Sequence, residues 1–395
     1  MTDKILILGA GYAGAVVANK LAREFRRSIA KGDVEITVLD KSEMAVNQGG
    51  FTFLPFSLYT PEDLIRSKRE LLSPRVNLKL GSEGEVTSID LDKQQVEVKG
   101  GSTYNYDYLV IALGARADVN GVEGLTDDLN TFYTSVEDSL KLGEKIRNFD
   151  GNRIVVSVSR MPIPCPGAPV KFSFLLDSYF KNVLKRDDVT ISLFWPMEPI
   201  GPPEFNKMVT GKFEEKGIEV FRNFKLGKVD ASNKVIESTE GEKEKYDLLV
   251  TVPPHKVQQV ILDSGLSDES GWIPFDKSTL QYRGSAGNHD NVYVLGDTGP
   301  MDVLKTGIGA HYQAMVVAHN LANDINGNGI KVSYNGETGC PIITDMAAPS
   351  KDGKAYIATW SYNLPPDEFD TTKLGWYMYR MYYYIHWDAS IKAIL

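Results

Sequence analysis

The chain has 395 residues, of which 42% are hydrophobic and 24% are charged, and this composition excludes a disordered or collagen-like protein. The formal net charge of −9 argues against nucleic acid as a partner, because an acidic surface repels a phosphate backbone. No apolar run approaches the ~20 residues of a membrane-spanning helix, and the first residues do not resemble a secretory leader. We therefore expect a cytoplasmic protein, either soluble or resting on a membrane surface.

The N-terminal part of the chain alternates between predicted strands and helices. An apolar run at 5–8 predicts a strand, the apolar spacing over 13–25 predicts a helix, and 34–39 predicts a second strand. This order is typical of a parallel sheet that helices cover on both faces. Residues 76–98 alternate in hydrophobicity as a β-meander does, and 106–112 predicts a further buried strand.

A second unit of the same kind begins near residue 120. Its expected helices lie at 135–149, 170–184 and 206–215, its expected strands at 153–158, 189–195 and 246–252, and an alternating segment at 220–237. Predicted strands at 272–280 and 291–295 and a helix at 307–325 then return to the first unit. The fold class is therefore α/β with two Rossmann-like dinucleotide-binding domains. The expected parts are 1–115 (first domain), 116–270 (second domain), 271–330 (return to the first domain) and 331–395 (C-terminal region).

A glycine-rich turn follows the first predicted strand and opens the first predicted helix. Gly9 suits the tight turn, Gly11 lets the backbone approach a pyrophosphate, and Gly14 lets the helix pack close to the strand. The free N–H groups of the helix N-terminus then face the phosphates. Asp40 ends the second strand, where a carboxylate can accept hydrogen bonds from a ribose. We therefore predict a dinucleotide cofactor at Gly9, Gly11, Gly14 and Asp40.

Two later segments indicate which dinucleotide binds. One strand ends in Ala112-Leu113-Gly114, and another, almost three hundred residues from the start, ends in Gly296-Asp297. Together with the glycine turn, these segments resemble the two-dinucleotide-domain flavoprotein superfamily. The resemblance implies FAD, with Ala112 and Gly114 beside it and the Asp297 carboxylate on its ribityl hydroxyls.

The helix that follows Gly296-Asp297 begins with a lysine. Lys305 and the helix N-terminus at Gly307 could stabilise negative charge on a reduced flavin. The alternative is an ordinary surface lysine. Both residues are counted among the predicted cofactor-binding residues.

The second unit lacks the glycine turn that NADH requires. After the strand at 153–158 comes the loop 159–169, which has four prolines and no glycine at the tight-turn position. Because proline has no N–H donor, a pyrophosphate would find few partners in this loop. We therefore expect NADH to be a poor substrate.

The two cysteines of the chain, Cys165 and Cys340, are too far apart in sequence for a metal motif. Taken alone, they read as two buried structural thiols. In context, Cys165-Pro166-Gly167 before a helix resembles the archaeal-type sulfide:quinone oxidoreductases, and Cys340 lies where that family has its second cysteine. The resemblance implies a Cys165/Cys340 redox pair, joined directly or through sulfur, that oxidises sulfide to sulfur or polysulfide. The electrons would pass through FAD to a membrane quinone.

Many relatives in that family carry a third cysteine near the segment that here reads 132–135. This chain has only two cysteines, so we predict that FAD is held non-covalently. The resemblance also places Pro55 beside the flavin, and His255 is a candidate for proton exchange near neutral pH.

The segment 376–387 is dense in aromatic residues and contains Arg380. Aromatic rings of this kind favour the membrane–water boundary, so we expect a C-terminal membrane-facing helix and a peripheral (monotopic) protein on the cytoplasmic side. The alternative is a helix that packs on the core or on a partner subunit. The sequence is compatible with a homo-oligomer.

Three other functions compete with sulfide oxidation. A type II NADH:quinone reductase has the same fold but needs phosphate donors after the strand at 153–158. A flavin subunit of a sulfide dehydrogenase is expected to carry a leader. A flavin-bound structural or signalling module would leave both cysteines without a redox role.

Overall fold

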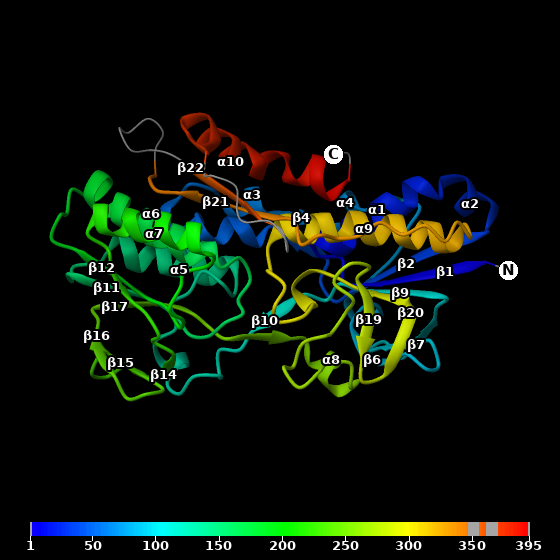
Figure 1. Ribbon diagram of the computed structural model, residues 1–395, viewed down its shortest axis with the longest axis horizontal. Coiled ribbons are helices and arrows are strands. Elements are labelled where there is room, and N and C mark those ends of the chain that lie inside the picture. The colour runs from blue at the N-terminus through cyan, green and yellow to red at the C-terminus, as the bar shows by residue number, and fades with distance from the viewer. Residues whose placement is uncertain (1, 347–354, 361–369, 394–395) are drawn as a thin grey trace.

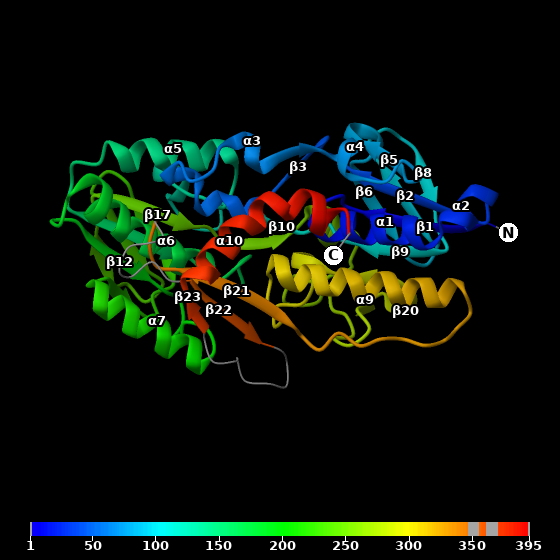
Figure 2. The same cartoon turned by 90° about the horizontal axis from the view of Figure 1, so that it is seen from above.

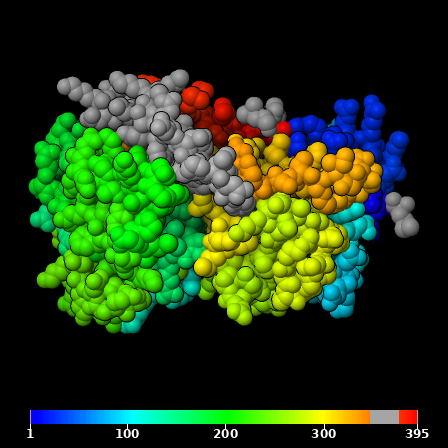
Figure 3. Space-filling view, viewed as in Figure 1, coloured from blue at the N-terminus to red at the C-terminus, as the bar shows by residue number. Residues whose placement is uncertain are grey.

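The computed structural model describes residues 2–346, 355–360 and 370–393, and for 355–360 and 370–375 it describes the backbone alone. Parts of the predicted C-terminal region 331–395 therefore lie outside the described residues. The chain forms two lobes that lie side by side (Figures 1 and 3). A sheet forms the centre of each lobe. The C-terminal helix lies at the top of the molecule in Figure 1, and Figure 2 shows that it runs over the middle, between the two lobes.

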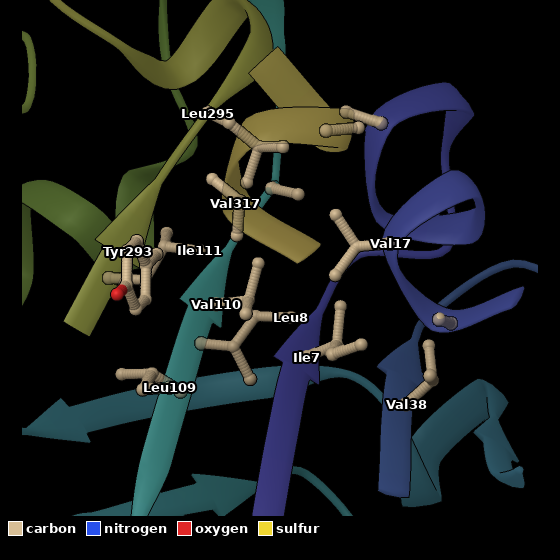
Figure 4. Close-up of a cluster of buried hydrophobic side chains, with 14 of the residues drawn as sticks. Ile7, Leu8, Val17, Val38, Leu109, Val110, Ile111, Tyr293, Leu295 and Val317 are labelled. Carbon is tan, nitrogen blue, oxygen red and sulfur yellow. The ribbon is translucent and has the colours of Figure 1, made fainter. Parts of the chain in front are cut away.

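The first lobe is built on a six-stranded sheet that combines the start of the chain with a distant segment. Its strand order is β19-β20-β9-β1-β2-β5, parallel except for β19. The strands are β1 (Asp3–Leu8), β2 (Val34–Asp40), β5 (Asn77–Leu80), β9 (Tyr108–Ile111), β19 (Gln281–Gly284) and β20 (Gly287–Val294). The central strands are apolar runs because side chains on both faces are buried (Figure 4).

Helices cover one face of this sheet, and a small antiparallel sheet lies on the other (Figure 1). The two helices α1 (Tyr12–Glu24) and α9 (Gly307–Ile325) pack side by side on the first face. The antiparallel sheet contains β6 (Val86–Asp90), β7 (Gln95–Val98) and β8 (Thr103–Asn105).

The second lobe repeats this plan. Its parallel sheet has the order β13-β12-β11-β17, with β11 (Arg153–Val158), β12 (Thr190–Phe194), β13 (Glu219–Phe221) and β17 (Leu248–Val252). One core forms between this sheet and the helices α5 (Val136–Arg147), α6 (Gly167–Ser178) and α7 (Pro203–Lys216). Another core lies under the antiparallel sheet of β14 (Leu226–Asp230), β15 (Val235–Ser238) and β16 (Lys243–Lys245). The two parallel sheets confirm the α/β class with two Rossmann-like folds.

The C-terminal segment connects the lobes. Strand β21 (Thr338–Ile343) pairs antiparallel with β22 (Ala355–Trp360), which pairs with β23 (Asp370–Thr372). Helix α10 (Lys373–Ile385) and η7 (His386–Ile391) follow and reach the first lobe, where the Ile391 carbonyl accepts a hydrogen bond of 2.9 Å from Asn19 of α1. None of the described helices is long and apolar enough to cross a membrane.

Short elements complete the chain. They are α2 (Arg26–Lys31), β3 (Met44–Val46), η1 (Gln48–Thr52), η2 (Leu54–Phe56), α3 (Pro61–Leu64), β4 (Ile65–Ser67), α4 (Lys68–Leu71), η3 (Gly81–Glu83), β10 (Ala115–Ala117), η4 (Leu125–Asp128), η5 (Tyr179–Leu184), β18 (His255–Val257), α8 (Gln259–Asp263) and η6 (Gly296–Thr298).

Two sequence predictions of strands are wrong. Residues 272–280 form no strand, because the Asp276 carboxylate accepts the N–H groups of Ser278 and Thr279 and makes a turn there; the strand starts at Gln281. The segment 76–98 is not one meander, because its first strand, β5, joins the parallel sheet instead. Alternation of polar and apolar residues predicts a strand but does not identify its partner.

Candidate active site

The glycine turn between β1 and α1 has no room for larger residues at two positions. Gly9 has φ +95°, and a Cβ there would collide with the Ala112 carbonyl oxygen. A Cβ on Gly14 would collide with the Gly9 carbonyl oxygen. Gly11, at the N-terminus of α1, has open space around its Cβ position. The turn is therefore packed on its inner side and open at Gly11, as close approach by a phosphate requires.

Asp40, at the end of β2, is hydrogen-bonded to the backbone of this turn. Its carboxylate accepts the Ala10 N–H at 2.7 Å and the Ser42 N–H at 2.8 Å, and it pairs with the buried Lys68 ammonium at 2.7 Å. Burial lowers the pKa of Lys68, and Asp40 opposes that shift. Both Asp40 oxygens therefore already serve the protein, and the predicted ribose contact would be an addition to these bonds.

Three other glycines predicted to bind the cofactor also have room around their Cα atoms. Gly114 has φ +68°, and a Cβ added there or at Gly307 would meet no atom within 4 Å. Gly296 has φ +73° and stands beside Ala13 of α1. None of the described residues donates a hydrogen bond to Asp297, and burial raises the pKa of that carboxyl. This cradle of open glycines with an acceptor at Asp297 fits an elongated cofactor such as FAD.

Lys305 is an interior residue and not the surface lysine of the alternative interpretation. Its ammonium donates to the Gly299 carbonyl at 2.7 Å and lies 3.9 Å from the centre of the Trp272 ring. Burial lowers the pKa of Lys305 to about 8, and Asp297 opposes the shift. A cation held at the N-terminus of α9 stands next to the cofactor cradle.

Cys165 and Cys340 lie together although 174 residues separate them in the chain. A Cβ on Gly167, two residues after Cys165, would collide with the Cys340 sulfur, and each of the two sulfurs shifts the pKa of the other. Strand β21 brings Cys340 there, and a hydrogen bond between Thr338 of β21 and Thr306, the N-cap of α9, fixes that strand. Both thiols are free.

The backbone at Cys165 is in an uncommon conformation. Its φ is +49°, in the left-handed region, which costs a residue with a side chain roughly 1 kcal/mol. Its carbonyl accepts the Ala168 N–H at 2.8 Å and the Tyr133 hydroxyl at 3.2 Å.

The two thiols differ in acidity. The hydrogen bond from Cys340 lowers the pKa of Cys165, and the Lys171 ammonium and the Ala168 N–H act in the same direction against burial. Donating that bond raises the pKa of Cys340, as does burial. Cys165 is therefore the sulfur that ionises first, and thiolates are the reactive form of cysteine.

Three residues of this site were missed by the sequence analysis: Lys171, Tyr379 and Tyr383. Lys171 lies on α6 with its ammonium 3.9 Å from the Cys165 sulfur and 2.9 Å from the Tyr379 hydroxyl. The Tyr379 and Tyr383 hydroxyls are 3.0 Å apart. The one available signal was a lysine in the otherwise apolar first half of a helix, six residues after the cysteine.

The structure bears on the predicted role of His255 but does not test that of Pro55. His255 contacts Tyr133 edge to face, but burial lowers its pKa to about 4, which argues against proton exchange near neutral pH. Pro55 lies in η2, where its backbone faces Gly143 of α5. Its predicted place beside the flavin stays untested.

Comparisons with known proteins bear on the class of protein to which the chain belongs. The family model described as pyridine nucleotide-disulphide oxidoreductase matches residues 3–157. A mitochondrial sulfide:quinone oxidoreductase of Dictyostelium discoideum is 28% identical over 99% of this chain and 86% of its own length. The chain is a homologue of the sulfide:quinone oxidoreductases. It is thus a flavoprotein of the oxidoreductase class.

Two further comparisons bear on the fold and on the alternatives. The crystal structure of sulfide:quinone oxidoreductase from Aquifex aeolicus superposes with a TM-score of 0.81 at 20% identity, covering 99% of this chain and 92% of that one, and so shows the same fold. A type II NADH:quinone oxidoreductase of Staphylococcus aureus is 30% identical, but over only 38% of this chain and 36% of its own length. The archaeal-type assignment stays a prediction.

Proposed function

We propose that this protein oxidises sulfide at Cys165 and Cys340 and passes the electrons through FAD to a quinone. The observation that carries the proposal is the contact between these two cysteines beside the cofactor cradle. The sulfide:quinone oxidoreductases among its relatives support the substrate and the acceptor. The proline-rich loop at 159–169, which holds Cys165 in place of a nucleotide turn, argues against NADH.

FAD would be held non-covalently by the glycine cradle. The turn at Gly9–Gly14 would receive the pyrophosphate, Asp297 would accept hydrogen bonds from the ribityl hydroxyls, and Lys305 would stand near the flavin ring. Both cysteines have the sulfur role, so no cysteine is left to tether the cofactor. When bound, FAD supplies the two-electron acceptor that reduces quinone.

The cysteines would take sulfur from one hydrosulfide ion and pass it to a second one. A hydrosulfide ion attacks one sulfur of the oxidised pair; the S–S bond breaks, a persulfide forms on one cysteine, and the other leaves as a thiolate. A second hydrosulfide removes the outer sulfur as a disulfane anion and leaves two reduced cysteines. Reforming the S–S bond from one thiol and one thiolate would release one proton and two electrons, which FAD would accept when it is bound. The Lys171 ammonium, 3.9 Å from the Cys165 sulfur, would stabilise that sulfur whenever it is a thiolate.

Anaerobic flavin reduction tests this function. We expect sulfide to bleach the yellow holoenzyme rapidly, a quinone analogue to restore the colour, and NADH to have little effect. Dithionite serves as the control, because it reduces the flavin without the cysteines. Bleaching by NADH and not by sulfide would replace the proposal with an NADH:quinone reductase.

Helix α10 presents one apolar face to the outside, and we propose that this face rests on a membrane. Its exposed side chains recur at the spacing of one helical face and are 39–58% exposed: Tyr377, Met378, Met381, Tyr384 and Ile385. The opposite face, with Trp376, Tyr379 and Tyr383, is buried in the protein. Such an amphipathic helix lies in the plane of the interface. The cytoplasmic side and a homo-oligomer stay predictions.

Introducing a negative charge on this face provides a test. Met378→Glu and Met381→Glu should each weaken binding to anionic phospholipid vesicles by about tenfold or more, because a buried methionine contributes about 1.5–3 kcal/mol and a carboxylate is repelled. Vesicle co-sedimentation measures the effect. Met197→Glu, at an exposed methionine between β12 and α7, is the matched control. Equal binding of the α10 variants and this control would contradict a membrane role for α10.

A further inference from the structure

Lys171 is a buried cation without a carboxylate partner among the described residues. Its side chain is on α6, and the residue is only 3% exposed. The Tyr379 hydroxyl, at 2.9 Å, is its one oxygen partner in the described part of the chain, and the Cys165 sulfur lies 3.9 Å away. Burying an ammonium group is costly unless a negative group neutralises it. The neighbour that can carry that charge is the Cys165 sulfur.

The partner of Lys171 belongs to the amphipathic helix. Tyr379 lies on the buried side of α10, opposite Met378 and Met381. Its hydroxyl is 3.0 Å from that of Tyr383, which donates to the Gly49 carbonyl at 3.0 Å. Through this chain of hydrogen bonds, the position of the Lys171 ammonium depends on how α10 packs on the rest of the protein.

We propose that Tyr379 is a positioning residue that holds the Lys171 ammonium at Cys165 and so keeps that cysteine in its reactive, ionised form. This role of Tyr379 serves sulfide oxidation only if the proposed function is correct, and so it rests on that function. Among the described residues, Tyr379 is hydrogen-bonded to Lys171 and to Tyr383 and not to either cysteine, so we expect it to act through Lys171. The buried face of α10 would thus position Lys171 beside Cys165, while the opposite face of the helix is exposed.

The ionisation that Tyr379 would influence is a simple acid equilibrium. The Cys165 thiol loses its proton to solvent, and Lys171 remains an ammonium ion on both sides of the equilibrium. Burial alone would lower the pKa of Lys171, but the sulfurs of Cys165 and Cys340 raise it overall. Other groups that face Cys165 are Asp297 of η6, Cys340 of β21, Tyr133 before α5 and Tyr379 of α10.

The test measures the acidity of one thiol and not turnover. The holoenzyme is reduced with a phosphine, the phosphine is removed, and alkylation of Cys165 by iodoacetamide is followed against pH by peptide mass spectrometry. In the unchanged protein, the rate should reach half of its maximum at a pH below the ordinary pKa of a cysteine thiol. Tyr379→Phe should move this midpoint upward and slow alkylation at low pH about three- to tenfold. Tyr384→Phe, which removes an exposed hydroxyl of the same helix, should leave it unchanged.

A double-mutant cycle separates positioning from general disturbance of the fold. Lys171→Met should shift the midpoint in the same direction at least as far, Lys171→Arg should restore most of the shift, and Tyr379→Phe should add nothing to Lys171→Met. An unchanged or lowered midpoint in Tyr379→Phe, or full additivity, would overturn the proposal. The alkylation midpoint is measured without sulfide. If Tyr379→Phe shifts this midpoint but sulfide does not bleach the flavin of the unchanged protein, the proposed function is wrong and the positioning role of Tyr379 is still supported.

Discussion

Cys165→Ser is expected to slow flavin reduction by sulfide about 10³-fold or more, since a serine oxygen cannot form the sulfur bridge through which the electrons leave. The side chains have nearly the same size, so the fold and the bound flavin should be retained. Stopped-flow absorbance after mixing with sulfide measures the rate. Dithionite reduction at the unchanged rate confirms that the flavin is in place.

The partner cysteine should behave as part of the same unit. Cys340→Ser is expected to produce a loss of similar size, and the double variant should be little worse than either single one, because both cysteines form one functional group. Sulfide turnover that survives in Cys165→Ser would show that the two thiols are structural, which is the alternative that the sequence left open.

Gly14→Ala is expected to abolish stable FAD binding. The new methyl group would collide with the Gly9 carbonyl oxygen and press on the Ala112 side chain, so helix α1 must move away from the turn at a cost of about 1–3 kcal/mol. That movement displaces the N–H groups that would receive the pyrophosphate. Flavin content after purification and FAD titration of the apoprotein measure the loss.

Two other glycines complete that experiment. Gly211→Ala, in the middle of α7 with no atom within 4 Å of the new methyl group, should bind FAD normally and gain about 0.5–1 kcal/mol in the free energy of unfolding. Gly11→Ala should fold normally but bind FAD weakly, because its methyl group enters only the open cradle. Unimpaired FAD binding by Gly11→Ala would show that the cofactor does not approach the turn there.

Much of the fold could be predicted because local patterns specify it. The apolar run of β1, the glycine turn and the helix α1 follow one another within the first 24 residues. Because they are adjacent, each of these patterns supports the prediction of the next. The strand predicted at 272–280 failed because an Asx turn at Asp276 outweighs its apolar residues. The helix predicted from residue 170 begins at Gly167, because proline is accepted in a first helical turn.

The sequence by itself determined the chemical inventory of this protein: three glycines in a strand-to-helix turn, two cysteines, a loop with four prolines and an aromatic segment at 376–387. Only the tertiary structure decided that Cys165 meets Cys340, that Lys171 and Tyr379 stand beside them, and that Lys305 is buried. The physical reason is that a helix or turn depends on neighbours along the chain, whereas these contacts depend on how β21 and α10 pack across both lobes. Such packing is fixed by the whole core, and apart from the lysine in the apolar first half of α6 the local sequence gives little sign of these contacts.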